Sequence, residues 1–251
     1  MDKTFGQVIG LAIDTFRKNI FRLFAVAVIL QAVVFLTGTL VVAVLPHLIG
    51  GLLVDVLVLA VSALQFGAFY YIVDERSDGL VVSVLDSIRM AKSVIWRLIG
   101  YFILQCIGCF ILLFLLFFGF QLSVNLILLF VLAMLSPIFL IFSSLAMPNL
   151  ALGGTNVWQS FRNSFKMAAK TFWVLLGGLI IFNIPVVIGG VLNGVAAFES
   201  IMGSLGYGSG ATGIGLLSIP LVIIAYILIT ATSGLVTCFL TTVYRSLPEP
   251  D

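Results

Sequence analysis

Residues 162–182 read RNSFKMAAKTFWVLLGGLIIF, and this stretch decides the fold. Arg162, Lys166 and Lys170 recur at four-residue steps, which places them on one side of a helix. Trp173 follows, and after it the sequence is purely apolar for several turns. A basic amphipathic segment that ends in an aromatic residue and leads into an apolar run is typical of a helix on the membrane surface followed by a membrane span.

The same arrangement occurs twice more, earlier in the chain. Residues 17–23 (RKNIFRL) align with residues 92–98 (KSVIWRL), and residues 89–96 (RMAKSVIW) align with residues 166–173 (KMAAKTFW). The aromatic positions Phe21, Trp96 and Trp173 are 75 and 77 residues apart. We predict one membrane domain, 1–251, built from three repeat units at about 1–75, 76–150 and 151–247. The alternative is that every span that starts in the cytoplasm looks basic and aromatic.

Composition and the placement of charge predict an all-α membrane protein. Hydrophobic residues make up 62% of the chain and charged residues 9%, with a mean hydropathy of +1.28. We predict six spans as three hairpins, each preceded by an amphipathic helix on the membrane surface. The spans lie at about 23–45, 51–73, 98–118, 124–147, 172–195 and 214–243.

Lys and Arg occur in four short groups, and the turns near 46–51, 119–123 and 197–213 contain neither. Cytoplasmic loops collect basic residues, so the N- and C-termini are predicted to be cytoplasmic. We expect a multi-pass protein of a bacterial or archaeal cytoplasmic membrane. The net charge of +2 is too small to indicate a nucleic-acid partner.

The basic groups also predict lipid contacts. We expect nine residues to contact the anionic headgroups of the inner leaflet: Arg17, Lys18, Arg22, Arg89, Lys92, Arg97, Arg162, Lys166 and Lys170. Phe21, Trp96 and Trp173 are the predicted anchors at the cytoplasmic interface. The apolar faces of the surface helices, including Phe161 and Phe165, are expected to face the acyl chains.

Ten residues beyond each anchor the chain carries Gln31, Cys106 (with Gln105 beside it) and Asn183. Ten helical residues span about 15 Å, which predicts a polar layer near the middle of the bilayer. Hydrogen bonds between helices are the favoured interpretation, and a site for a solute is the alternative.

Two further places in the sequence are candidate sites. Asp55 enters the second span about one turn from its outer end, and His47 in the preceding turn is a candidate partner for it. The spacing of Cys106 and Cys109 matches a redox or metal pair, but both lie within an apolar run, which favours simple packing. The sequence predicts no catalytic residues, no metal site and no cofactor.

Several short motifs resemble a known family. They are the residues 19–23 (NIFRL), 135–140 (LSPIFL), Met147-Pro148, 158–166 (WQSFRNSFK) and 241–246 (TTVYRS). The pattern resembles the YciC-like family of bacterial inner-membrane proteins and the membrane domain fused to some glycerophosphodiester phosphodiesterases. The resemblance implies a six-helix membrane domain with surface helices and without assigned catalytic residues. It does not imply the phosphodiesterase activity, which belongs to a separate soluble domain.

These observations lead to one functional prediction and one alternative. We predict a non-catalytic membrane protein that acts as an accessory or scaffold subunit or in lipid homeostasis, with a membrane-protein partner or a second copy of itself. The alternative is a small transporter or binder of a lipid-like or apolar solute, which would use Gln31, Gln105 and Asn183. A transporter predicts a wet central cavity and unwound spans, whereas a scaffold predicts a dry core.

Overall fold

A computed structural model describes residues 4–77, 81–121, 135, 137–204 and 214–247. Every regular element in these ranges is a helix. Five of the helices contain a segment long and apolar enough to cross a membrane: Phe5–Val44, Ile49–Glu75, Ile95–Leu112, Val157–Pro185 and Ile223–Arg245. The chain is therefore an all-α protein of the multi-pass membrane type, as predicted.

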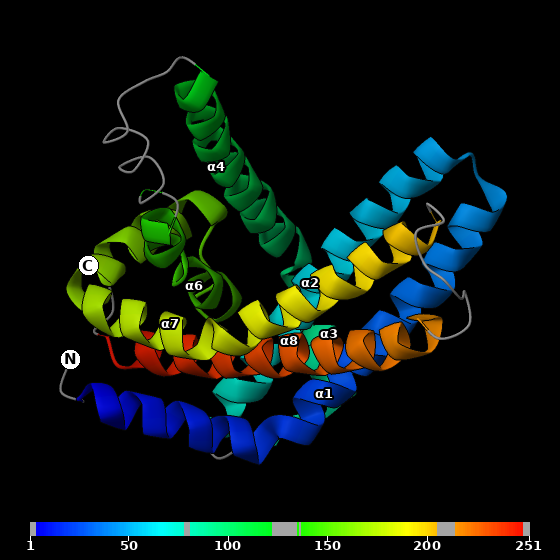
Figure 1. The fold of residues 1–251 in the computed structure, drawn as a ribbon. Coiled ribbons are helices and arrows are strands. Elements are labelled where there is room, and N and C mark those ends of the chain that lie inside the picture. The colour runs from blue at the N-terminus through cyan, green and yellow to red at the C-terminus, as the bar shows by residue number, and fades with distance from the viewer. Residues whose placement is uncertain (1–3, 78–80, 122–134, 136, 205–213, 248–251) are drawn as a thin grey trace.

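Two long helical hairpins lie side by side and form the dense part of the molecule (Figure 1). The first consists of α1 (Phe5–Val44) and α2 (His47–Ser77), and the second of α7 (Val157–Ser204) and α8 (Ile214–Arg245). Glycines permit the close approach: a Cβ on Gly178 would lie 2.1 Å from the ring of buried Phe239, and one on Gly234 would lie 2.9 Å from that of Phe16. Small residues of this kind let helix backbones approach closely in membranes.

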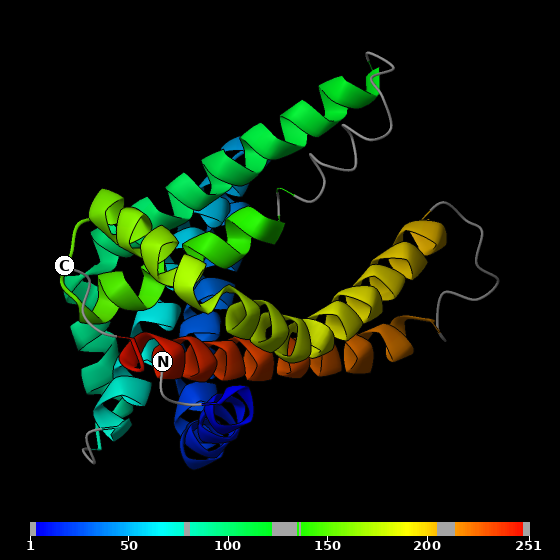
Figure 2. The ribbon, with the colours of Figure 1, turned by 90° about the vertical axis from the view of Figure 1, so that its left-hand side faces the viewer.

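The middle of the chain forms a looser part. It contains α3 (Val84–Ser93), α4 (Ile95–Gln121), a helical segment at 137–143 and α6 (Ala146–Leu152). Figures 1 and 2 both show α4 projecting away from the α7–α8 hairpin, with the 137–143 segment between α4 and α7. Half of the predicted fourth span, 124–147, lies outside the described residues, and its residues 137–147 belong to the apolar helix Pro137–Leu152.

The passage from surface segment to span differs between the three predicted units. In the first, both belong to the continuous helix α1. In the second, α3 ends at Ser93, and Val94 with ψ of 6° separates it from α4. In the third, α7 continues through a kink at Thr171, whose φ of −125° and ψ of 19° are not helical. The predicted surface segments are therefore set off from their spans by a break in the second and third units, whereas in the first unit the helix continues without one.

The apolar faces of the predicted surface segments pack mainly on protein. Val8 and Ala12 on α1 are fully buried, and Phe16 lies against α8. On α7, Phe161 is buried with its ring 5.3 Å from that of Tyr101, and Phe165 lies 5.3 Å from the ring of Phe142. The expectation that these aromatics face the acyl chains is wrong for Phe161, because the neighbouring helices supply a closer apolar surface.

Contacts between helix ends tie one end of the bundle together. The Arg245 Nε donates to Asp74 Oδ1 at 2.6 Å, which joins the ends of α8 and α2. The Tyr244 hydroxyl donates to Asn149 Oδ1 at 3.3 Å, and Arg97 Nη1 donates to the Gly154 carbonyl at 2.8 Å. The start of α4, the start of α7 and the ends of α2, α6 and α8 therefore meet at one end.

Candidate functional site

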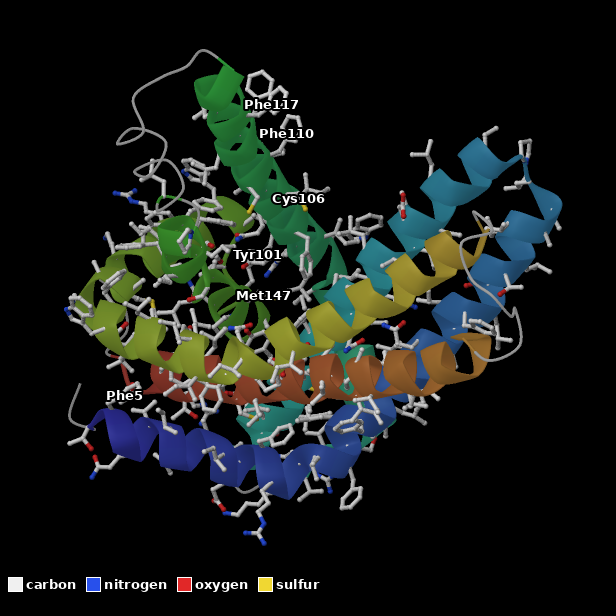
Figure 3. All side chains as sticks on the ribbon, viewed as in Figure 1. Phe5, Tyr101, Cys106, Phe110, Phe117 and Met147 are labelled. Carbon is white, nitrogen blue, oxygen red and sulfur yellow. The ribbon has the colours of Figure 1, made fainter. Side chains whose placement is uncertain are left out.

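A cavity of about 510 Å³ lies where the loose and dense parts of the molecule meet. Helices α2, α4, α6, α7 and α8 and the 137–143 segment all contribute to its wall. Figure 3 shows two of the lining side chains, Tyr101 on α4 and Met147 on α6, in the space between α4 and α7. Leu140 and Ile180 also line the cavity and are exposed, so the cavity opens at the surface of the apolar segments.

The wall is mostly apolar and carries a few polar groups. The polar lining residues are Tyr70, Tyr101, Gln105, Ser144, Asn183 and Thr237. Three of these side chains donate hydrogen bonds to backbone carbonyls of their own helix or turn. Asn183 Nδ2 donates to the Leu179 carbonyl at 2.7 Å, Ser144 Oγ to the Ile141 carbonyl at 2.7 Å, and Thr237 Oγ1 to the Ser233 carbonyl at 2.8 Å.

Gln105 is different, because its side-chain oxygen is buried and lacks a hydrogen-bond partner in the described part of the chain. A buried acceptor without a donor costs about 1–3 kcal/mol. A rotation of the Gln105 side chain towards the cavity would let Oε1 accept a hydrogen bond from a bound molecule or water.

The predicted polar layer is only partly brought together. Gln105 and Asn183 line the same cavity, and Gln31 does not. Two contacts give the reason: α1 packs antiparallel to α8, with Phe16 at Gly234 and the Ala27 carbonyl 3.4 Å from the Tyr226 hydroxyl.

Gln31 is one helical turn beyond Ala27 on α1. Because the two helices are antiparallel, Gln31 lies past Tyr226 in the direction of the start of α8. Asn183 instead shares the cavity with Val236, ten residues from Tyr226, or about 15 Å along α8. Equal spacing from the aromatic anchors therefore does not place Gln31 and Asn183 at the same level along α8.

The three predicted anchors share one property. Phe21, Trp96 and Trp173 are 88%, 81% and 78% exposed. Large aromatic side chains that a protein leaves this exposed are the kind that lie at the membrane interface. Trp158, which the sequence analysis did not select as an anchor, is 76% exposed and has the same character.

The predicted headgroup residues are found on α1, α3, α4 and α7, and all except half-buried Arg22 are exposed. Some of them have protein partners: Lys18 pairs with Asp14, and Arg89 lies 3.9 Å from Asp86. Among the described residues, Arg162, Lys166 and Lys170 form no ion pair. These three residues of α7 remain the best candidates for binding an external anion.

The remaining candidates give weaker sites. Asp55 is exposed on α2, and the side chain of His47 lies outside the described ones, so their predicted pairing stays a prediction. Cys106 is exposed, Cys109 is half-buried, and both are free thiols. Within the described residues no group of three His, Cys, Asp or Glu side chains could hold a metal ion.

Sequence reasoning missed the long-range links Asn149–Tyr244 and Asp74–Arg245, whose partners are 95 and 171 residues apart. It also missed Tyr101, Ser144 and Thr237 as cavity residues. Gly153 is the sequence feature that accompanies the Asn149–Tyr244 link. A Cβ at this position would lie 2.7 Å from the Asn149 side-chain oxygen and 2.9 Å from the Tyr244 hydroxyl.

Comparison of the chain with protein-family models, with curated proteins and with solved structures found no match. The resemblance to the YciC-like family stays a prediction.

Proposed function

We propose that the chain is a non-catalytic integral membrane protein that binds a lipid-like molecule within the bilayer. Two observations carry this proposal: Gln105 lines an apolar cavity, and its buried Oε1 has no hydrogen-bond partner among the described residues. A volume of about 510 Å³ falls in the range of pockets that bind small ligands. The proposal develops the transporter-or-binder alternative, with Gln105 and Asn183 as its residues and without Gln31.

The chemistry of the cavity restricts the ligand. An apolar wall stabilises a hydrocarbon body, and one buried acceptor selects a single hydroxyl or amide donor. Among the residues that the structure describes, no Lys or Arg lines the cavity, so no described cation compensates a charged headgroup there. A neutral amphiphile with one donor, such as a long-chain alcohol or a diacylglycerol, fits these features.

Ligand retention after purification in mild detergent tests the proposal. We expect native mass spectrometry to find a lipid-like molecule on the protein, and Gln105→Leu and Ile180→Trp to reduce its occupancy about tenfold. Gln31→Leu and Ile184→Trp are matched controls, because Gln31 is a half-buried amide and Ile184 an exposed isoleucine of α7, and neither lines the cavity. Equal occupancy in all four variants would contradict the proposal.

We further propose six spans with both termini in the cytoplasm of a bacterial or archaeal cell, and a threefold repeat as their origin. The similar exposure of Phe21, Trp96 and Trp173 supports the repeat. In a chain without its native cysteines, Ser123→Cys is expected to react with an impermeant thiol reagent from outside, and Arg89→Cys is not. Arg89 is a suitable inner position because its side chain is 86% exposed. The reverse pattern would invert the topology.

A role as an accessory or scaffold subunit is the second candidate. The observation in its favour is the exposed apolar surface of α4, which includes Phe110, Phe114 and Phe117. Replacing Phe110 and Phe117 with alanine should release a membrane-protein partner that co-purifies with the chain, or convert a dimer to a monomer. Phe35→Ala on α1 is the control, because Phe35 is similarly exposed and lies on a different helix.

A further inference from the structure

A second cavity, of about 620 Å³, lies between α4 and the first half of α7. We call it the α4–α7 groove. Its lining consists of Leu104, Ile107, Gly108, Ile111, Phe139, Trp158, Phe161, Arg162, Phe165 and Lys166. It shares no lining residue with the central cavity, and the 137–143 segment contributes to both walls.

The groove has an apolar floor along α4. Leu104, Ile107 and Ile111 recur at steps of three and four residues and so lie on one face of that helix. They are 7 to 14 residues beyond Arg97, which is tied to the start of α7, and this corresponds to about 10–20 Å along the helix. That distance is comparable to the hydrocarbon thickness of one leaflet, which is about 15 Å.

Aromatic packing forms the wall before any ligand binds. The ring of Phe139 lies over Gly108, where a Cβ would be only 2.5 Å from it. Phe165 packs on Phe139 at 6.4 Å, and Phe161 packs on Tyr101 at 5.3 Å. These contacts hold the rings in place along the groove, so little ordering is needed when a ligand enters.

The α7 side of the groove is basic. Arg162 and Lys166 are one helical turn apart, both line the groove, and both are exposed. In the part of the chain that the structure describes, the ion pairs use Asp14, Asp74 and Asp86, and none of these carboxylates pairs with Arg162 or Lys166. Trp158 lines the same side, is largely exposed, and supplies an indole N–H donor.

We propose that the α4–α7 groove binds an anionic phospholipid, with its phosphate held by Arg162 and Lys166 and one acyl chain along Ile107 and Ile111. Two unpaired cations beside an apolar channel of this length match the polarity of a phospholipid from phosphate to mid-chain. The site differs from the central cavity in its charge, and so in the lipid that it selects.

Titration of the full-length protein with phosphatidylglycerol and with phosphatidylcholine of the same acyl chains, followed by native mass spectrometry, tests the proposal. We expect the wild-type protein to prefer phosphatidylglycerol, and the double variant R162Q/K166Q to lose about tenfold in affinity for it. R76Q/R245Q removes two charges at the ends of α2 and α8, outside the groove and outside the predicted headgroup residues, and should change affinity less than twofold. Equal affinity for the two lipids, or equal losses in both double variants, would overturn the proposal.

A second pair of variants tests the acyl-chain part. Ile107→Trp fills the floor of the groove and should lower phosphatidylglycerol binding, whereas Phe110→Trp on the same helix, which does not line it, should not. Soluble glycerol phosphate should compete weakly, because it lacks the chain. Full competition by glycerol phosphate, or an Ile107→Trp variant that binds normally, would show that the site holds only a phosphate.

The side chains of Ile107 and Phe110 are both exposed, and thermal melting in detergent checks that the tryptophan variants at these positions remain folded. Gln105→Leu should retain phosphatidylglycerol at the wild-type level, so a failure of this proposal is distinguishable from a failure of the central-cavity proposal.

Discussion

Helices α8 and α4 are both apolar enough to cross a membrane, yet α8 is packed well inside the protein and α4 is mostly exposed. In the most apolar part of α8, Ile223–Arg245, 44% of residues are buried inside the protein, against 11% in Ile95–Leu112 of α4. Helix α8 lies in the dense hairpin pair, whereas α4 projects from it (Figure 1). Both cavities described above have α4 as a wall.

The difference follows from how helices associate in lipid. Acyl chains are as apolar as leucine side chains, so two spans associate through close packing and not through exclusion from water. Helix α8 has that packing, because Phe239 lies against Gly178 and Phe16 against Gly234. The close contacts of the described α4 residues lie in its first half, at fully buried Leu98, at Gly100 and at Gly108, whereas Phe110, Phe114 and Phe117 in its second half are exposed.

The largest expected effect comes from adding a methyl group at a glycine that contacts a phenylalanine ring, at one position in the dense part and one in the loose part. Gly178→Ala should lower stability by about 3 kcal/mol, because the new methyl group overlaps the fully buried ring of Phe239. Gly108→Ala should cost about 1 kcal/mol, because half-buried Phe139 has room to rotate away. Melting temperatures in one detergent give the comparison, and equal losses would show that the two parts are equally rigid.

The native cysteines report on the same difference without a mutation. Cys106 on α4 is exposed, and Cys238 on α8 is fully buried. In detergent, a small maleimide should modify Cys106 at least tenfold faster, because modification of Cys238 requires the dense part to open. Peptide mapping by mass spectrometry gives both rates, and denaturation in SDS should make them equal.

The link between the ends of α2 and α8 should have a smaller effect. Arg245 and Asp74 are 2.6 Å apart, but both remain partly exposed, so Arg245→Gln should cost no more than about 1 kcal/mol. A double-mutant cycle with Asp74→Asn isolates the coupling between the two side chains. A coupling near zero would show that packing alone holds these helix ends together.

The smallest effect is expected at the two glutamines. Gln105→Leu should leave the stability of the ligand-free protein unchanged or raise it by roughly 1 kcal/mol, since it removes a buried acceptor without a donor. Gln31→Leu should change stability by less than about 1 kcal/mol, the usual size of a hydrogen bond within the membrane. Destabilisation by Gln105→Leu would mean that its oxygen already has a partner.

Local patterns predicted the class of fold and the positions that face outwards. Apolar length placed five of the six predicted spans on long apolar helices, although α1 and α7 begin well before the predicted starts of their spans. The basic–aromatic pattern selected Phe21, Trp96 and Trp173, all of which are highly exposed. The class of fold is predictable because hydropathy acts on each helix separately.

What the sequence did not predict depends on how helices pack on one another. Gln31 was expected beside Gln105 and Asn183, but the offset of α1 along α8 is fixed by contacts such as Phe16 with Gly234, which spacing within one helix does not reveal. The two cavities arise from the angle between α4 and α7. That angle is a tertiary property without a local signature.

The break at Thr171 gives α7 a mechanical property that α1 lacks. Thr171 is buried, and its hydroxyl donates to the Met167 carbonyl at 3.0 Å, so the joint is fixed to the turn before it. A few residues with non-helical dihedral angles absorb rotation at lower cost than a continuous helix absorbs bending. The segment before the joint carries Arg162 and Lys166, and the segment after it carries Asn183. The break therefore divides α7 into a part that lines the α4–α7 groove and a part that lines the central cavity.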